Sequence, residues 1–380
     1  MAGSILDNNF SGHKSNIQSK ISSKIVSKES DKIPDIVIKK MVVVGNTTMC
    51  HIFLNKDVTG LKGAPFSVAY EGVYRTNSYD IGFKIYDIDE VIVLPNIMAH
   101  VGADAAAVLC KEKMYKTGIN EIAIDIGTNA EILLNCSGKV FVTSTAAGPA
   151  FEGKGIHSGM RAAPGAINSV KISRVNGNII LGMLDDGKAE NPRGLCGSGL
   201  IDAISELMKA RLLKKDGYLL TREEALRQNV NINLCEHLKS DDKDGNCFIL
   251  SKENNIVITQ KDIRNVQLAK GAIQAGCEIL LKKAGIGLND INSIKIAGVF
   301  GKYIHVSQAM NFGLFPKYPE KLEIVGNAAG DGAAMALFED GFIDEMEKQV
   351  KKVHHVELAG EKDFQKKFMN AMELKEWYYN

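Results

Sequence analysis

Apolar residues follow two different spacings along this chain. Short runs rich in Val, Ile and Leu predict strands at Lys40–Val44, Val91–Leu94, Glu121–Asp125, Glu131–Asn135, Val140–Ser144, Ser293–Ala297 and Lys321–Val325. Helical spacing predicts helices at Ser198–Ala210, Arg222–Arg227 and Thr259–Ala284, shorter ones beginning near Met49 and Val101, and another that ends at about Asp340. Thr259 followed by Asp262 is typical of a helix start. This mixture predicts an α/β protein.

The composition is that of an ordinary folded domain without a strong overall charge. Of the 380 residues, 45% are hydrophobic and 24% charged, and the net charge is +1. No long-range field would therefore attract nucleic acid or a membrane surface. No apolar run reaches the roughly 18 residues that a membrane span needs, and the N-terminus has no secretory pattern. The seven cysteines show no C-x-x-C spacing, which favours a reducing, cytoplasmic location.

The strongest chemical signal is the segment Ile122–Glu131. A buried strand carries Asp125 to its end, where Gly127 and Thr128 begin a tight hairpin. Gly127 allows a phosphate to approach the backbone, and the amides of the turn can point at its oxygens. Asp125 would hold Mg²⁺ through water or orient a water that attacks a γ-phosphate. The alternative is an ordinary hairpin, because the motif is short.

Small residues continue after the third strand of this hairpin system. Residues 143–153 and 159–166 are rich in Gly and Ala, and they include Gly148. Such runs are costly in a plain core, because glycine loses much backbone entropy on folding, but they suit a backbone that packs around a ligand. Glu152 and Arg161 are candidate site charges, with surface positions as the alternative.

Two further glycine turns are candidates for ligand contact. The loop that contains Gly197 and Ser198 opens a helix, whose first amides form an anion site. It lacks the Lys of a Walker A loop, and no strand is expected to end in it, which argues against a dinucleotide fingerprint. Cys196 in this loop is either a reactive thiol or a packing residue. The segment 296–301 ends a strand in a glycine turn that would suit the flat face of an adenosine.

Together these segments resemble the superfamily of acetate and sugar kinases, heat-shock ATPases and actin (ASKHA). They are most similar to one branch, the ATPase domain of the reductive activators of corrinoid proteins. The resemblance covers about residues 40–340 and rests on VVVGNTTMCHIFL, LPNIMAHVGADAA, IDIGTNAEILL, STAAGPAFEG, GMRAAPGAI, GLCGSGLIDA, ITQKDIRNVQLAKGAIQAG, IAGVFGKYI and VGNAAGDGAAMAL. It implies an α/β, two-lobed, actin-like (RNase H-like) ATPase fold.

The resemblance also implies a function and assigns site residues. Such proteins use ATP and Mg²⁺ to drive an electron onto an inactive Co(II) corrinoid, which restores Co(I) for methyl transfer. By position, the second phosphate loop is matched by Asp125, Gly127, Thr128 and Asn129. The adenosine segment is matched by Gly298, Phe300 and Gly301. Asn327 and Gly330 match the helix that returns to the first lobe.

Two departures from the family pattern stand out. The first phosphate hairpin, another Asp-x-Gly-Thr-Thr, does not occur in residues 1–44, so we expect a first lobe that is truncated at its N-terminus. Asp104 would supply some of the missing carboxylate function, the alternative being an ordinary helix N-cap. The four-cysteine iron–sulfur domain does not occur either, so a separate ferredoxin-like protein would donate the electron.

The expected organisation follows from this resemblance. Residues 1–33 are a polar tail or a degraded remnant, and 34–118 are what remains of lobe I. Residues 119–315 form lobe II, 316–342 the returning helix and 343–380 a C-terminal extension.

Several alternatives stay open on the sequence alone. With half of the phosphate clamp, the chain is either an ATP-dependent activator or a pseudo-ATPase that docks on a corrinoid protein without hydrolysis. A small-molecule kinase of the same superfamily is disfavoured, because the motif wording follows the activator branch. The expected partner is a corrinoid protein, with neither nucleic acid nor a membrane, and self-association as a homodimer is not decided.

Overall fold

The computed structural model describes residues 37–63, 66–83, 87–184, 191–241, 244–298 and 304–378. Residues 40–380 form one compact unit. The expected tail at 1–33 and two of the expected adenosine contacts, Phe300 and Gly301, lie outside the described residues. Among the described residues, no helix has the length and apolar character needed to cross a membrane.

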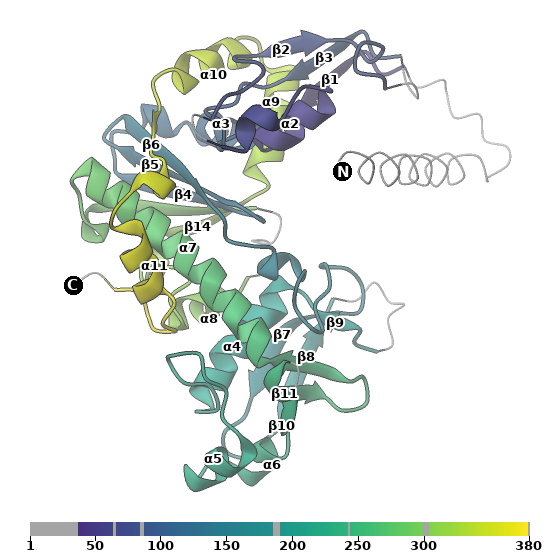
Figure 1. The fold of residues 1–380 in the computed structure, drawn as a ribbon, viewed down its shortest axis with the longest axis vertical. Helices are drawn as coiled ribbons and strands as arrows, with labels where there is room; N and C mark the ends of the chain where they lie inside the picture. The colour runs from purple at the N-terminus through teal and green to yellow at the C-terminus, as the bar shows by residue number, and fades with distance from the viewer. Residues whose placement is uncertain are drawn as a thin grey trace, which may run out of the picture. The chain divides into compact units, whose positions relative to one another are not determined.

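A six-stranded mixed sheet organises this unit (Figure 1). Its strand order is β14-β13-β4-β5-β6-β15, with bounds β14 Leu322–Gly326, β13 Ser293–Ala297, β4 Glu121–Ile126, β5 Ala130–Cys136, β6 Lys139–Thr145 and β15 His354–His355. The antiparallel meander β4–β5–β6 confirms the hairpins expected from the sequence. Strand β13 runs parallel to β4 and to β14, so the ends of β4 and β13 meet at one edge of the sheet.

The sheet separates two hydrophobic cores because its residues alternate between its faces. On one face Ile122, Ile124 and Ile132 join a large core beneath helix α7, Gln260–Ala284. On the other face Ala123 and Leu133 join a smaller core. Both faces are therefore covered, and the strands are almost continuously apolar.

The smaller core belongs mainly to lobe I, which we define as β1, β2, β3, α2, α3, α9 and α10. Strands β1 Lys40–Val43, β3 Glu90–Val93 and β2 Tyr74–Thr76 form a sheet in the order β1-β3-β2. Helices α2 Thr47–Phe53, α3 Ala103–Lys111, α9 Ala328–Phe338 and α10 Phe342–Val350 complete it. Gly332 of α9 lies so close to α3 that an added Cβ would meet the Ala107 carbonyl at 2.7 Å. The small residues of both helices thus permit close packing.

The part of the unit beyond the meander carries the glycine loops. Strands β7 Ala166–Ile172, β8 Ile179–Met183 and β9 Gly194–Leu195 form one sheet, and β10 Leu238–Asp241, β11 Gly245–Ser251 and β12 Ile256–Thr259 form another. The helices are α4 Gly197–Lys209, α5 Arg222–Arg227, α6 Ile232–Cys235, α7 Gln260–Ala284 and α8 Val306–Asn311. The expectation that no strand leads into the Gly197 loop was wrong. The two-residue β9 pairs with β7 there, and it is too short to leave a hydrophobic pattern.

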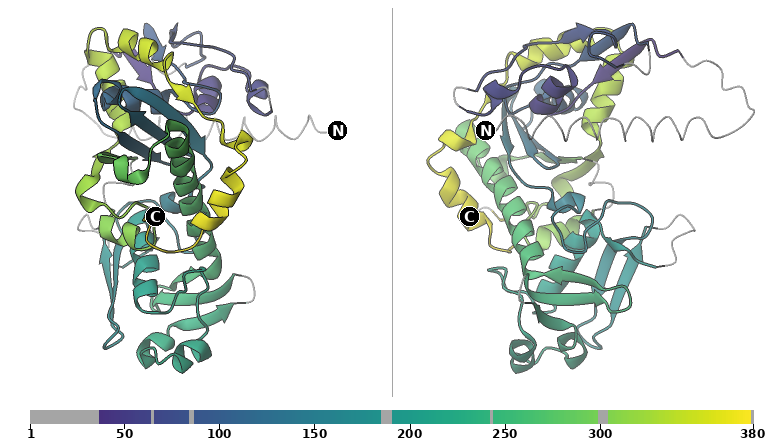
Figure 2. Two further views of the ribbon diagram at one scale, coloured as in Figure 1. Left: turned by 90° about the vertical axis from the view of Figure 1, so that its left-hand side faces the viewer. Right: turned by 45° about the vertical axis from the view of Figure 1, so that its right-hand side comes forward.

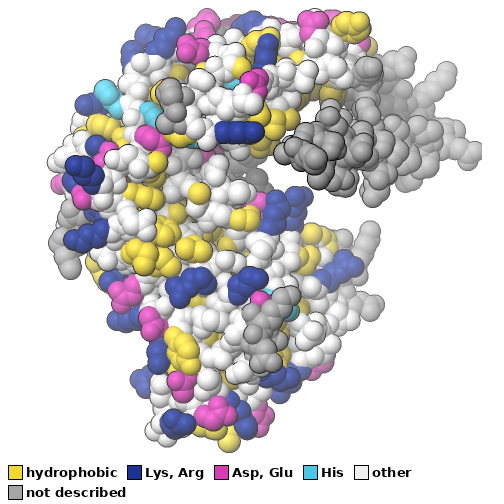
Figure 3. Space-filling view, in the orientation of Figure 1, with side chains coloured by type: hydrophobic (Ala, Val, Ile, Leu, Met, Phe, Trp, Pro, Cys, Tyr) yellow, Lys and Arg dark blue, Asp and Glu magenta, His cyan; other side chains and the backbone are white. Residues whose placement is uncertain are grey.

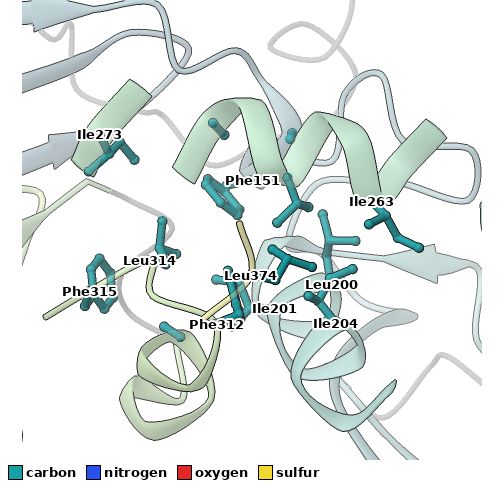
Figure 4. Packing of buried hydrophobic residues seen from close by; sticks show 14 of the residues in the cluster. Phe151, Leu200, Ile201, Ile204, Ile263, Ile273, Phe312, Leu314, Phe315 and Leu374 are labelled. Atoms are coloured by element: carbon teal, nitrogen blue, oxygen red, sulfur yellow. The ribbon is translucent and has the colours of Figure 1, made fainter. Parts of the chain in front are cut away.

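Phe151 fixes the loop after β6 in the large core. Figure 4 shows its ring between α7, which supplies Ile263 and Ile273, and α4, which supplies Leu200. Phe151 is 3% exposed. The adjacent Glu152 is therefore held in place by burial of its neighbour.

Helix α7 begins with the capping box expected from the sequence. The Thr259 side chain accepts from the Asp262 amide, and Asp262 accepts from the Thr259 amide. Helix α11, Phe364–Ala371, lies along α7 (Figure 2). Lys270 of α7, 1% exposed, donates from Nζ to the Ala371 and Glu373 carbonyls. One buried lysine thus secures the chain after α11.

Replacing Lys270 by Met will destabilise the fold by about 1–3 kcal/mol, because two buried carbonyls lose their donor. Denaturant unfolding measures this, and hydrogen exchange will show faster opening of residues 371–378. The matched control is Lys282→Met, which removes an exposed ion pair between the same helices, with Asp363. Exposed pairs contribute little, so the control should unfold like the original chain. Equal losses in both variants would contradict the assignment.

Candidate functional site

A cavity of about 460 Å³ opens at the edge where β4 and β13 end. Seven of the residues expected at a nucleotide site line it: Asp125, Gly127, Glu152, Gly197, Ser198, Gly298 and Asn327. The other lining residues are Ile126, Phe151, Arg161, Ala162 and Cys196. The volume lies within the range of about 300–1,000 Å³ that is usual for small-molecule sites. Residues from the hairpin, the Gly197 loop, the end of β13 and the start of α9 thus meet around one space.

Hydrogen bonds fix the turn of the hairpin on the loop after β6. The Gly127 amide donates to the Asn129 carbonyl at 2.9 Å, and the Gly148 amide to the Thr128 carbonyl at 2.8 Å. The Thr128 hydroxyl donates to Glu152 Oε1 at 2.8 Å. Thr128, Asn129 and Gly148 do not line this cavity. Thr128 and Gly148 instead hold the residues that do.

Glu152 is kept ionised by its neighbours. Lys154 Nζ lies 3.2 Å from its carboxylate. Although partial burial opposes it, the bonds from Thr128 and Lys154 lower the pKa of Glu152. Glu152 therefore adds a negative charge to the wall of the cavity, which Asp125 also lines.

The first turn of α4 carries partial positive charge, opposite in sign to the charge of Glu152. Cys196 is its N-cap residue and makes no side-chain cap bond. A helix of this length carries partial positive charge and unbonded amides at its start, where Gly197 and Ser198 line the cavity. The Cys196 thiol lies 3.3 Å from both the Ile167 carbonyl and the Ser198 hydroxyl, so the buried cysteine packs the loop. This start of α4 is suited to a phosphate.

Gly298 allows the ends of β13 and β4 to approach each other. Its φ is +107°, and an added Cβ would lie 2.6 Å from the Ile126 carbonyl and 3.3 Å from Asp125 Oδ1. A side chain at this position would both strain the backbone and enter the space beside Asp125.

Three carboxyl groups interact at the base of the turn, and one of them, Asp125, lines the cavity. Asp125 and Glu131 are directly paired across β4 and β5, and Asp104 of α3 is near enough to affect both. Burial, with the charge of Asp104, raises the pKa of Asp125 to about 7. Burial, with both aspartates, raises the pKa of Glu131 well above its usual range. Buried like charges that interact in this way do not all ionise together.

Asp104 is not the N-cap of α3. Gly102 is the N-cap, and Asp104 stands in the first turn and accepts from the Ala105 amide. Burial raises the pKa of Asp104. The N-cap alternative is therefore wrong, and Asp104 belongs to the acidic group behind the cavity and not to its lining.

Asn327 and Gly330 lie together at the start of α9. The Asn327 side chain caps the helix by accepting from the Gly330 amide at 3.2 Å. Asn327 lines the cavity, whereas Gly330 does not. Gly330 therefore contributes a bond that positions Asn327.

Glu131 was missed by the sequence interpretation, although the sequence carries a signal for it. Residues 127–129 form the turn, so Asp125 and Glu131 must face each other across the hairpin. Two carboxylates in such a pair are unfavourable without a function or a proton. Arg161, noted only as a candidate charge, is exposed and lines the cavity.

No metal cluster is preformed here. Among the residues that the structure describes, no three or more His, Cys, Asp and Glu side chains are arranged to hold a metal ion. Mg²⁺ in proteins usually keeps several waters and is bound by one or two carboxylates together with substrate phosphates. Asp125 and Glu152 are the two carboxylates that line the cavity.

Two family models match the chain. One, described as the C-terminal domain of RACo, the ASKHA domain, matches residues 120–379. The chain belongs to this family. A second model, described as the RACo middle region, matches residues 9–117 and so begins inside the expected tail. The resemblance found in the sequence is confirmed.

Relatives with names are similar along most of this chain. It is 35% identical over 347 residues to "Corrinoid activation enzyme RamQ" of Eubacterium limosum, an alignment that covers 87% of this chain and 55% of that protein. It is 26% identical over 375 residues to the "[Co(II) methylated amine-specific corrinoid protein] reductase" of Methanosarcina barkeri, covering 90% of this chain and 63% of the relative. This RACo-family chain thus spans less than two thirds of the length of each of these relatives.

A solved structure supports the same fold. The "Reductive activator for corrinoid,iron-sulfur protein" superposes with a TM-score of 0.80 at 31% identity, over 95% of this chain and 55% of that one. The α/β, actin-like ASKHA fold expected from the sequence is therefore confirmed.

Proposed function

We propose that this RACo-family chain is the nucleotide-binding part of an ATP-dependent system that reduces corrinoid proteins from Co(II) to Co(I). One observation carries the proposal. Asp125, the start of α4 and Gly298 come from distant parts of the sequence and line one cavity. Relatives named for corrinoid activation and Co(II) corrinoid reduction supply the class of partner.

The cavity offers complementary groups for a magnesium nucleotide. The amides at Gly197 and Ser198 and the guanidinium of Arg161 would face the phosphates. Asp125 would hold Mg²⁺ through water, and Glu152 would orient the attacking water. The bound ion would neutralise charge on the phosphoryl group. Gly298 would leave room beside the nucleoside.

Nucleotide turnover and reduction would be coupled without a redox group on this chain. The donor, a separate iron–sulfur protein, would lose one electron as Co(II) gains one, and ATP with water would give ADP and phosphate. Cys50 and Cys110 lie in the smaller core and Cys235 and Cys277 in the larger, so these four thiols are not grouped in one place. The corrinoid protein would dock on this chain.

A second candidate is a relative that docks on the corrinoid protein without hydrolysing ATP. The residues that line the cavity favour this candidate. They lie between Asp125 and Asn327 in the sequence, and they include none of the described residues 37–118. Catalysis of phosphoryl transfer depends on groups positioned on all sides. A cavity that lacks such groups on one side would permit ATP to bind without being hydrolysed.

The deciding experiment uses the full chain, a Co(II) corrinoid protein and a low-potential reductant. We expect the Co(I) absorption band to appear only with Mg²⁺ and ATP, and phosphate release to accompany it. Calorimetric binding of ATP with no phosphate release would select the docking candidate. If Co(I) does not form and the chain does not associate with the corrinoid protein, the proposal is refuted.

Binding of the magnesium nucleotide should depend on pH. Mg²⁺ needs the ionised form of Asp125, whose pKa is about 7 in the folded protein. Below pH 7 the carboxyl is mostly protonated, so affinity should fall by up to about tenfold per pH unit. Above pH 8 it should level off. Calorimetry at pH 6, 7 and 8 tests this, and an equally steep slope in Asp125→Asn would contradict it.

A further inference from the structure

A histidine that follows strand β13 is joined to helix α4 by its side chain. His305 Nδ1 lies 2.9 Å from Asp202 Oδ2 and 3.0 Å from Asp202 Oδ1. A carboxylate can only accept, so Nδ1 carries the hydrogen and donates it. The Asp202 side chain is 3% exposed, whereas that of His305 is 52% exposed. An exposed side chain from a distant part of the sequence thus reaches a buried carboxylate on α4.

The sheet beneath α4 accounts for the burial of Asp202 without His305. Asp202 Oδ2 accepts from the Val170 amide at 3.2 Å. Glu206, one turn later on α4, accepts from the Ile172 amide at 3.0 Å. These carboxylates satisfy amides of β7 beyond the two residues that pair with β9. The contact between Asp202 and His305 is therefore additional to the packing of α4 on β7.

His305 also does not serve the helix that it precedes. It is the N-cap residue of α8, but its side chain makes no cap bond. Its carbonyl accepts from the Gln308 amide at 2.9 Å and from the Ala309 amide at 3.2 Å, which begins the helix without the imidazole. The imidazole is directed at α4 instead.

Helix α8 is held on α4 by other contacts as well. Gln308 Nε2 donates to Glu206 Oε1 at 3.0 Å. Phe312, just after α8, and Ile201 of α4 both belong to the large core shown in Figure 4. Replacing His305 would therefore release the start of α8 from α4 without unfolding either helix.

Both partners of the contact are connected to walls of the nucleotide cavity. Asp202 follows the first turn of α4, where Gly197 and Ser198 line the cavity. Gly298 lines it at the end of β13, and His305 comes soon after Gly298 in the sequence. The chain that leaves one wall is thus fixed again on the helix that forms the other.

We propose that His305 positions the nucleoside end of the bound nucleotide through its contact with Asp202. The inference rests on the proposed function, in which the phosphates face the start of α4 and the nucleoside lies beside Gly298. A ligand binds more tightly when the parts of the chain around it are already fixed, because less conformational entropy is lost on binding. His305 is a positioning residue, since it does not line the cavity itself.

The first test measures the affinity for ATP with Mg²⁺ by calorimetry in three variants of the full chain. His305→Leu should bind ATP about tenfold more weakly, because it loses the donor to Asp202. His305→Asn should stay within about threefold, because its amide nitrogen can take the place of Nδ1 and donate. Gln308→Ala, the matched control, removes another contact between α8 and α4 and should stay within about twofold.

The second test uses inorganic tripolyphosphate, which has phosphates but no nucleoside. With Mg²⁺ it should bind the unaltered chain and His305→Leu alike. Figure 3 shows basic and acidic side chains interspersed over the described part of this face, so a phosphate chain should bind only weakly there outside the cavity.

The outcomes separate this inference from the proposed function. Unchanged ATP binding in His305→Leu, an equal loss in Gln308→Ala, or equal weakening of ATP and tripolyphosphate would overturn the inference. If ATP-dependent Co(I) formation continues in His305→Leu with unchanged ATP affinity, only the inference fails and the proposed function stands. If the unaltered chain binds no ATP, the proposed function fails and the inference fails with it.

Discussion

We expect Asp125→Asn to slow the proposed ATP-dependent Co(I) formation by about 10²–10³-fold, because the cavity loses the carboxylate that we propose to hold Mg²⁺. The folded protein should not be weakened. Asn removes a charge that Asp104 and Glu131 disfavour, and it preserves the shape of the side chain. Initial rates at saturating ATP, together with thermal unfolding, measure the two effects separately.

The control for this variant is Asp340→Asn, the same change at an exposed position just beyond α9. It should leave the rate within about twofold of the unaltered chain, since screened surface charges have little effect at a distance. A normal rate in Asp125→Asn would show that the ion is held elsewhere. A lowered melting temperature would show that the carboxylate is structural.

Gly298→Ala will destabilise the fold by about 1–3 kcal/mol and weaken nucleotide binding by tenfold or more. The added methyl meets the Ile126 carbonyl at 2.6 Å, and a φ of +107° strains any side chain. Relief of that contact must move the end of β13 away from β4, which displaces Asp125. Urea unfolding and calorimetry with ATP and Mg²⁺ measure both consequences.

Gly138→Ala separates strain from collision. Gly138 has a similar φ of +95°, but an added Cβ there meets nothing within 4 Å. This control should lose stability through strain alone and bind nucleotide normally. If both alanine variants bind equally well, Gly298 has no role at the site beyond its backbone conformation.

The sequence by itself determined the elements that have a strong local signal. The three strands around Gly127 are short apolar runs separated by tight turns, and Thr259 with Asp262 caps α7 through bonds three residues apart, so both were predictable. The order of glycine motifs also determined the family. Short elements such as β9 were not predictable, because two residues cannot show a period.

Only the tertiary structure decided which of these motifs meet. Gly298 follows Asp125 by more than 170 residues, yet the parallel pairing of β13 with β4 brings their ends together. The same pairing rules place Glu131 opposite Asp125, and the packing of α3 adds Asp104, so burial and mutual repulsion raise their pKa values. The sequence alone located the phosphate turn. The turn became one side of a cavity only through the pairing of β13 with β4, because hydrogen bonds between strands bring together residues at any separation in the chain.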